Sequence, residues 1–504
     1  MSVLNSLTQH PRVKGWFDGE GLPRRVHLVV GLLIPLTMLA WQMWVVRMYT
    51  VDDAYISFRY ARNLAAGHGL VYNLGEAVEG YTNFSLTVIL GAGMAVGIDP
   101  HPLSKVLGAA AALGTLVVVY RLSNRLLPLT GLPCVATWLL ATSAPFSNWS
   151  VFGLETTIFA FLVLLGTLLM FRETEAGKGF VGSALVFAAA GLTRPEAPMY
   201  LGLPMLLLGR RFVSAQNLKR GLLFAAPLLA HMIWRKAYYG SWVPSTLGAK
   251  TGDMALQIKR GTSYLGGWLD HAGPAVWLAL YGAGLAVAKR SLEFGALALV
   301  SVCGLVYVLL VGGDWMSYSR FVVPIEPYIF VLAGVTVRTI VETRDRAALV
   351  ALLIFAVWVG NARQVTMQKS HKQFRNERRH WNISAGRVAD WIRGNLPKGR
   401  VALGDIGFVG YRTNYPILDL LGLVDPVIHE LPGGYTKKVG DGYLERFYEV
   451  SPEHAVLIMT NDECRRPALP GVRVLTEDPR FSRYRPVHAV TMASDVTWCI
   501  FTRR

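Results

Sequence analysis

Long apolar runs alternate with short clusters of basic residues over the first 360 positions of the chain. A membrane-spanning helix needs about 20 mostly apolar residues, and cytoplasmic loops collect Lys and Arg. With the basic clusters as guide, the runs predict about eleven transmembrane helices, with the N-terminus in the cytoplasm and the C-terminus outside. The predicted helices cover roughly residues 26–46, 103–121, 132–147, 155–171, 179–192, 197–209, 220–236, 273–288, 293–312, 321–340 and 347–360.

The apolar stretch 84–98 is short for a span, and we expect it to lie at the membrane interface within a long outer loop, residues 47–102. If it crosses the membrane instead, the later helices invert and the C-terminal segment becomes cytoplasmic. The basic run HKQFRNERRH at 371–380 would suit that alternative. We prefer the outer placement, because most basic loops then share one side and this run can lie along anionic headgroups or lipid phosphates.

Residues 361–504 have the pattern of a soluble α/β domain. SAGRVADWIRGNLP, 384–397, predicts an amphipathic helix that ends at Gly and Pro. RVALGDIGFVGY, 400–411, and EHAVLIM, 453–459, predict strands with turns. The fold class is therefore a polytopic α-helical membrane protein, with a transmembrane domain over 1–360 and a C-terminal α/β domain over 361–504.

Composition agrees with a membrane protein, since 52% of residues are hydrophobic and only 16% are charged. The formal net charge of +17 is explained by basic cytoplasmic loops and anionic headgroups, with phosphate-bearing substrates as an additional cause. We find no nucleic-acid-binding motif behind the charge. Cys464 and Cys499 could form a disulfide if the C-terminal domain lies outside the cytoplasm.

Ionisable residues beside membrane spans are costly to place there and are therefore candidates for function. Four polar clusters fall on the predicted outer face, whereas the inner loops are mainly basic. These clusters are Asp52–Asp53, Arg194–Glu196, Lys236–Lys250 and Asp314–Arg320.

The first cluster has two interpretations. Adjacent carboxylates repel each other, so one pKa is raised, and such a group beside a membrane suits a general base. Alternatively, the pair caps an amphipathic helix that begins there and presents Tyr55, Phe58 and Arg59 to the interface.

The other clusters are also open to two readings. Arg194 could bind phosphate oxygens with Glu196 holding it in place, or it could be an interfacial arginine. The aromatic segment before Lys250 suits sugar stacking or membrane anchoring. The loop from Asp314 to Arg320 could line a pocket or be a plain loop. We find no zinc-ligand spacing, no Gly-rich phosphate loop and no Ser/His/Asp arrangement.

VDDAYISFRYARNLAAGHGLVYNLGEAVEGYTN, 51–83, resembles the first outer loop of the mycobacterial and corynebacterial membrane arabinofuranosyltransferases. More broadly it resembles the GT-C glycosyltransferases, which use polyprenyl-phosphate sugars. The resemblance covers nearly the whole chain, because further segments occur in the order expected of that group: GLETTIFAF, GLTRPEAP, YYGSWVPSTLGAK, GGDWMSYSRFVVP and GDIGFVGY. The tail is shorter than in the mycobacterial enzymes, which leaves cell-wall arabinan, lipopolysaccharide or a surface protein as the acceptor.

The resemblance implies a GT-C fold in the bacterial inner membrane and transfer of arabinofuranose from a polyprenyl phosphate, decaprenyl phosphate being favoured, to an envelope glycan on the outer face. It implies Asp52 as the base with Asp53 as its partner, and no cofactor; a divalent metal bridging the pair is not favoured. By position we assign the donor phosphate to Arg194, Lys250 and Arg320. Residues that bind or orient substrate would be Glu196, Tyr55, Arg59, Glu79, Tyr239, Asp314 and Trp315.

Three other functions remain open. A sibling enzyme would transfer another lipid-linked sugar, such as a hexose or aminoarabinose, to lipopolysaccharide or protein. A transporter of lipid-linked sugars would place polar residues through the membrane and show an inverted repeat, neither of which is apparent in the sequence. In a non-catalytic binding protein, Asp52 would be dispensable.

Overall fold

The structure is a computed structural model, and it describes residues 24–126, 134–177, 181–208, 214–246, 254–288, 291–342, 346–431, 441–460, 464–493 and 496–504. Its first half is helical. The elements are α3 (Arg24–Leu28), η1 (Val29–Leu33), α4 (Ile34–Val46), α5 (Asp52–Ala65), α6 (Phe84–Ala95), α7 (Pro100–Leu126), α8 (Val135–Ala141), α9 (Ala144–Trp149), α10 (Thr156–Ala176), α11 (Gly182–Thr193), α12 (Ala197–Leu206) and α13 (Ala215–Tyr239).

The second half continues with helices and ends in a small mixed domain. The elements are α15 (Met254–Ala272), α16 (Ala275–Ala288), α17 (Leu292–Val311), η3 (Arg320–Val322), α18 (Glu326–Glu342), α19 (Arg346–Glu377), η4 (Arg378–Ser384), α20 (Ala385–Asn395), β1 (Val401–Leu403), α21 (Ile406–Thr413), β2 (Ile417–Asp419), η5 (Ile428–Glu430), α22 (Asp441–Val450), β3 (His454–Met459), α23 (Pro470–Glu477), η6 (Pro479–Arg483), β4 (Tyr484–Ala493) and β5 (Val496–Arg503).

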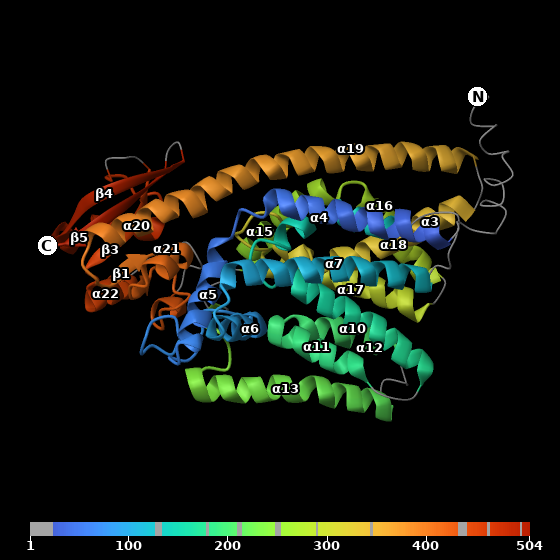
Figure 1. Ribbon diagram of the computed structural model, residues 1–504, viewed down its shortest axis with the longest axis horizontal. Coiled ribbons are helices and arrows are strands. Elements are labelled where there is room, and N and C mark those ends of the chain that lie inside the picture. Colours follow the sequence, from blue (N-terminus) through green and yellow to red (C-terminus); the bar gives the residue numbers. More distant parts are fainter. Residues whose placement is uncertain are drawn as a thin grey trace.

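Figure 1 shows a long helical body with the sheet domain at one end, and α5 and α6 beside that domain. Within the described residues, five helices are long and apolar enough to cross a membrane: 24–46, 100–126, 156–176, 292–311 and the apolar part of 346–395. Shorter apolar helices, α6 among them, accompany these five. The chain is thus a multi-pass membrane protein.

Three sequence predictions differ from the structure. The helix expected over 132–147 is broken into α8 and α9, because Ser143 caps a new helix, with the Phe146 N–H 3.4 Å from its hydroxyl oxygen, and Pro145 follows. α15 lies between the predicted spans 220–236 and 273–288, where no helix is predicted, and polar residues interrupt its apolar positions. Residues 406–413 form α21 rather than strand, so only three residues of that segment pair in the sheet.

The C-terminal domain is built on a five-stranded sheet of order β2-β1-β3-β5-β4 within the described residues. β1 pairs in parallel with β2 and β3, whereas β5 runs antiparallel to β3 and β4. α21 connects β1 to β2 and begins just beyond the carboxyl end of β1. This is the carboxyl edge of the parallel part of the sheet, where helix N-termini gather and ligands commonly bind.

A single hydrophobic core runs across the junction between the first loop and the C-terminal domain. Ile56 and Tyr60 of α5 and Tyr72 of the loop pack in one cluster with residues of α20, β1 and α21. The predicted boundary at residue 360 lies inside α19, which continues to Glu377 and carries the chain along the body to the sheet domain (Figure 1). The domain is therefore attached both through α19 and through its contact with α5.

Cys464 and Cys499 form a disulfide with a Cα–Cα distance of 5.7 Å. It ties the segment after β3 to β5, which lies beside β3 in the sheet. The pairing is the one that the sequence left open.

Candidate active site

Asp52 stands at the first position of α5, yet it does not cap that helix. Val51 is the N-cap residue, and it makes no side-chain capping bond. The Asp52 carboxylate instead accepts hydrogen bonds from the backbone N–H groups of Gly407, at 2.9 Å, and Phe408, at 2.8 Å. These N–H groups lie in the first turn of α21, where no intrahelical acceptor is available. The capping interpretation therefore holds for a different helix, 355 residues further along the chain.

Burial is the main electrostatic influence on this carboxylate, whose residue is 5% exposed. Burial raises the pKa of Asp52 to about 7, and the neighbouring charge of Asp53 raises it further, while the two N–H groups oppose the shift. The pKa of Asp405, just before α21, is also raised well above its usual value by burial and by Asp52 and Asp53. Three carboxyl groups thus meet at the junction, and one titrates near neutral pH.

Glycine allows α21 to approach α5 so closely. A Cβ at Gly407 would overlap the backbone carbonyl and carboxylate of Asp52, and a Cβ at Gly410 would overlap the Tyr72 hydroxyl. Arg59 fixes the same contact from about two helical turns further along α5. Its guanidinium donates to the carbonyl oxygens of Gly410 and Tyr415, both at 2.8 Å. We call this set of residues the α5–α21 contact.

Arg194 lies between two carboxylates rather than facing an open pocket. It donates to Glu196 at 2.6 Å and to Glu155 at 2.9 Å, and all three side chains are under 10% exposed. Glu155 also accepts from Asn83 at 3.0 Å, and the Asn83 oxygen accepts from Ser57 of α5 at 3.1 Å. The network joins the ends of α6, α10, α11 and α12 to α5. It contains two carboxylates and one guanidinium, so formal negative charge exceeds positive charge by one.

Arg320 and Asp314 form an ion pair at 2.9 Å, with side chains 8% and 2% exposed. Trp315, between them in the loop, is 39% exposed and contacts Trp381 with ring centroids 5.8 Å apart. Lys250, the third residue predicted to contact phosphate, lies outside the described residues.

The remaining predicted orienting residues hold the first loop in place. Glu79 pairs with Arg235 of α13 at 2.7 Å, and burial raises the pKa of Glu79 against the effect of that arginine. Tyr239 donates to the carbonyl oxygen of Leu70 at 2.7 Å. Tyr55 is buried and packs on Phe408 with centroids 4.7 Å apart. The structure thus brings these side chains to the same end of the helical body.

The sequence reasoning missed two charged residues at this end. Glu155 lies in GLETTIFAF, a segment used only for the resemblance, although a carboxylate beside an apolar helix is itself a signal. Lys105, near the start of α7, donates to the backbone carbonyl oxygens of Arg47, at 2.6 Å, and Tyr49, at 2.5 Å. It forms no ion pair with a described residue, and the same signal would have marked it.

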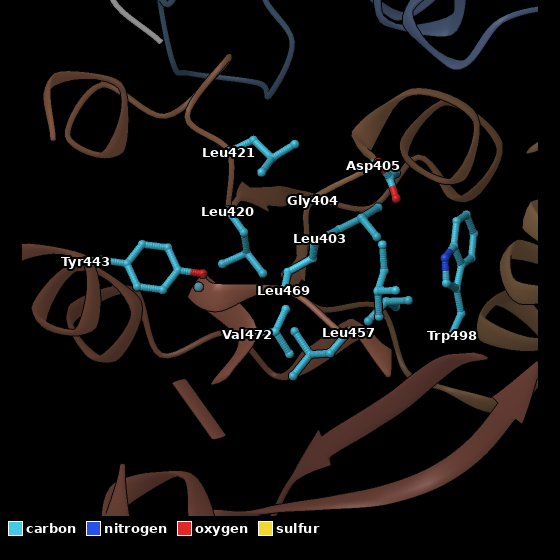
Figure 2. A pocket seen from close by; sticks show the side chains of 13 residues that line it. Leu403, Gly404, Asp405, Leu420, Leu421, Tyr443, Leu457, Leu469, Val472 and Trp498 are labelled. Atoms are coloured by element: carbon cyan, nitrogen blue, oxygen red, sulfur yellow. The ribbon is translucent and has the colours of Figure 1, made fainter. Parts of the chain in front are cut away.

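One cavity lies inside the C-terminal domain beside Asp405. Figure 2 shows it lined by Leu403, Leu420, Tyr443 and Trp498. Its volume of about 30 Å³ admits only a few water molecules. Over the part of the chain that is described, no group of three or more His, Cys, Asp or Glu side chains is placed to hold a metal ion.

The fold is similar to that of solved GT-C membrane glycosyltransferases, as the sequence resemblance implied. The structure aligns with ArnT from Cupriavidus metallidurans bound to undecaprenyl phosphate, with a TM-score of 0.54, 12% identity, and 94% of this chain and 97% of that chain covered. It aligns with the apo oligosaccharyltransferase of Archaeoglobus fulgidus with a TM-score of 0.57, 9% identity, and 91% and 80% covered. At these identities the likeness defines the fold alone.

Sequence comparison points to a narrower group within that fold. The chain is 30% identical over 375 residues to a terminal β-(1→2)-arabinofuranosyltransferase of Corynebacterium glutamicum, which covers 63% of this chain and 52% of the relative. A protein of the same name from Mycobacterium tuberculosis is 31% identical over 247 residues, covering 45% and 38%. The chain thus spans about half the length of the corynebacterial relative and less of the mycobacterial one. Residues 368–501 match a family described as a domain of unknown function, DUF8728.

Proposed function

We propose that this chain transfers arabinofuranose from a polyprenyl-phosphate donor to a cell-envelope glycan, on the outer face of the bacterial inner membrane. The observation that carries the proposal is the position of the Asp52–Asp53 pair at the junction of a GT-C helical body and its C-terminal domain. The similarity to two terminal arabinofuranosyltransferases supports the choice of sugar. The favoured donor is decaprenyl-phosphate arabinofuranose.

In this proposal Asp52 is the general base. An acceptor hydroxyl is a weak nucleophile, and a carboxylate that takes its proton during attack strengthens it. The hydroxyl oxygen forms a bond to the anomeric carbon, its proton passes to Asp52, and the bond from that carbon to the phosphate oxygen breaks. The electron pair of that bond leaves with the polyprenyl phosphate. A pKa of about 7 matches the base to neutral pH.

The leaving group carries negative charge, so cations near it lower the barrier. Arg320, Lys250 and Arg194 remain our proposed phosphate contacts. Arg194 is bonded to both Glu155 and Glu196, so in this arrangement it orients the site. It would contact the phosphate only after one of those two bonds opens. Lys105 joins the proposed set, because its ammonium group bonds only to carbonyl oxygens among the described residues.

The test is reconstitution of the full chain with a synthetic polyprenyl-phosphate arabinofuranose and an arabinofuranose oligosaccharide acceptor. We expect wild type to transfer and Asp52→Asn to be at least about a hundredfold slower. Asp390→Asn is the matched control, because Asp390 is exposed on α20, where it pairs with Arg412 at 2.7 Å. Equal rates for the wild type and the folded Asp52 variant would remove Asp52 from catalysis.

A donor panel tests the sugar itself. Polyprenyl-phosphate hexose and aminoarabinose, offered under the same conditions, should transfer at much lower rates than arabinofuranose. Transfer of another sugar with arabinofuranose inactive would contradict the proposed donor and leave the reaction class standing. Facilitated passage of labelled donor across the vesicle without transfer would favour the transporter alternative.

A further inference from the structure

A cavity of about 200 Å³ lies immediately before α5, next to the α5–α21 contact but lined by other residues. Four stretches far apart in sequence form its walls: the connection from α4 to α5, the end of α9, the loop after α17, and the region where α19 passes into η4. The lining residues are Tyr49, Val51, Trp149, Phe152, Trp315, Met316, Ser317, Tyr318, Glu377 and Trp381. We call it the aromatic cavity. It is larger than the cavity of about 150 Å³ that admits a benzene ring.

Glu377 is the charged group in this aromatic wall. Its carboxylate accepts hydrogen bonds from the hydroxyl groups of Tyr49, at 3.1 Å, and Ser317, at 2.6 Å. Gln373 contacts it more weakly, at 3.5 Å. A carboxylate has about four acceptor positions, so acceptor capacity remains. The hydroxyl of Tyr318, which is 5% exposed, has no hydrogen-bond partner within the described residues.

The backbone around the cavity is held in uncommon conformations. Tyr318 and Ser319 have φ of 69° and 49°, in the left-handed region that residues other than glycine rarely adopt. The Trp149 indole N–H holds this turn by donating to the Tyr318 carbonyl oxygen at 2.9 Å. On the opposite wall, Trp381 lies in η4, a π-helical segment. Both features occur preferentially at binding and functional sites.

Aromatic faces together with a carboxylate and hydroxyl groups match the chemistry of a sugar ring. The apolar C–H face of a sugar packs on an aromatic ring, and its hydroxyl groups donate to a carboxylate. A prenyl chain would use the rings but would leave the remaining acceptor positions of the Glu377 carboxylate desolvated and unfilled, which is costly. Val51 lines the cavity and directly precedes Asp52, so a ring bound there would lie beside the proposed base.

We propose that the aromatic cavity binds one sugar ring of a substrate, with Glu377 accepting hydrogen bonds from its hydroxyl groups. The inference rests on the proposed glycosyl transfer and extends it by assigning a place for the ring. The ring belongs either to the lipid-linked donor or to the end of the acceptor glycan. Both present the same chemistry to the cavity, and the KM values of the two substrates separate them.

Glu377→Gln keeps the size of the side chain and removes its charge. We expect the KM of one substrate to rise about tenfold with a smaller change in kcat, which is the loss of a charge-assisted hydrogen bond. A higher KM for the lipid-linked donor assigns the bound ring to the donor, and a higher KM for the acceptor assigns it to the glycan. Glu449→Gln is the matched control, because Glu449 is a 69% exposed carboxylate in the C-terminal domain. If both KM values stay within twofold of wild type, the inference is wrong.

A binding measurement decides the inference independently of turnover. Trp315 is exposed enough that Trp315→Phe should fold normally, and it should remove part of a fluorescence change on titration with the arabinofuranose oligosaccharide or the lipid-linked sugar. A saturable change in wild type that both Trp315→Phe and Glu377→Gln weaken supports the ring site even if no arabinofuranose is transferred. No saturable change with either sugar ligand, or an equal change with decaprenyl phosphate alone, would overturn it.

Discussion

The α5–α21 contact and the aromatic cavity lie on either side of the start of α5, and they use their polar groups differently. In the contact, Asp52 and Arg59 are bonded to backbone groups of the C-terminal domain. In the cavity, the Glu377 carboxylate accepts hydrogen bonds only from side chains within the described residues and retains acceptor capacity, and in the same part of the chain the Tyr318 hydroxyl has no partner. The first arrangement joins two parts of the chain, whereas the second is suited to an external ligand.

The difference also shows that a polar residue can have both roles. Asp52 belongs to the contact by its hydrogen bonds, yet we propose it as the base. Fixing a carboxylate at the N-terminus of a helix orients it without adding a formal charge, and burial keeps its pKa near neutral. The position of the base therefore depends on how the C-terminal domain docks.

Asp52→Asn should have the largest effect, a loss of about 10² to 10⁴ in kcat/KM. In wild type, kcat/KM should rise with pH and level off above about pH 7, because Asp52 must be deprotonated to accept a proton. Asp53, whose charge raises the pKa of Asp52, remains in the variant, as does Asp405, the third carboxyl group at the junction. The pH–rate profile of the variant should lack the limb near pH 7.

The same substitution predicts a change in stability with pH. The folded protein holds the Asp52 proton more tightly than the unfolded chain, so this group's contribution to stability should be full below about pH 4 and fall as pH rises towards 7. Thermal unfolding at pH 5 to 8 should show a weaker decline in Asp52→Asn than in wild type. An unchanged pH dependence of both rate and unfolding would contradict the assigned pKa.

Gly407→Ala should displace the base without removing it. The new methyl group overlaps Asp52, so α21 must move, and displacements of about 1 Å can cost a hundredfold in rate. We expect a loss of about 1 to 3 kcal/mol in stability from the same overlap. Gly394→Ala, at a helical glycine with open space around it, should leave both rate and stability unchanged or slightly improve stability. Transfer assays with thermal unfolding compare the pair.

Arg59→Lys should weaken docking more than chemistry. Lysine retains the charge but cannot direct a planar set of donors at Gly410, Tyr415 and Tyr72 together. We expect a loss of about 2 kcal/mol in the stability of the C-terminal domain and roughly a tenfold loss of transfer. Hydrogen exchange should show faster opening of α21, with Arg393→Lys, an exposed position, as the control. Wild-type protection of α21 would contradict the docking role.

Tyr49→Phe should have the smallest effect, since it removes one donor to Glu377 and leaves the ring in the cavity wall. We expect a two- to fivefold change in the KM of the substrate that Glu377→Gln affects, and no change in the other. Tyr415→Phe, which removes a hydroxyl bonded to Leu396 in the C-terminal domain, is the control. A change in the pH–rate profile of Tyr49→Phe would place Tyr49 with the base instead of the ring.

Most helices were predictable from the sequence because their apolar runs are continuous. The start of α10 is within one residue of its predicted position, and α5 was expected from the polar pattern after Asp52. The partners of the polar residues were not predictable. Local sequence shows that Asp52 begins a helix, but not that its carboxylate reaches Gly407, because that contact depends on how the C-terminal domain packs.

The same limit applies to the charged residues of the site. Arg194 was identified with Glu196 from their spacing, but Glu155, its second partner, is 39 residues away. Glu377 lies in a basic run that the sequence assigned to lipid headgroups, and only the packing of α19 against Tyr49 and Ser317 places its carboxylate in a cavity. A run of basic residues indicates that the segment as a whole prefers an anionic surface. A single residue within the run can nevertheless point into the protein interior.

The length of α19 has a mechanical consequence. Its 32 residues form a helix about 48 Å long, and it passes through η4 directly into α20 of the C-terminal domain. Glu377 and Trp381 lie where α19 meets the C-terminal domain. A tilt of the domain would therefore change the width of the aromatic cavity, and the same movement would shift α21 relative to Asp52. The aromatic cavity and the position of the base therefore both depend on the angle at which the C-terminal domain meets α19.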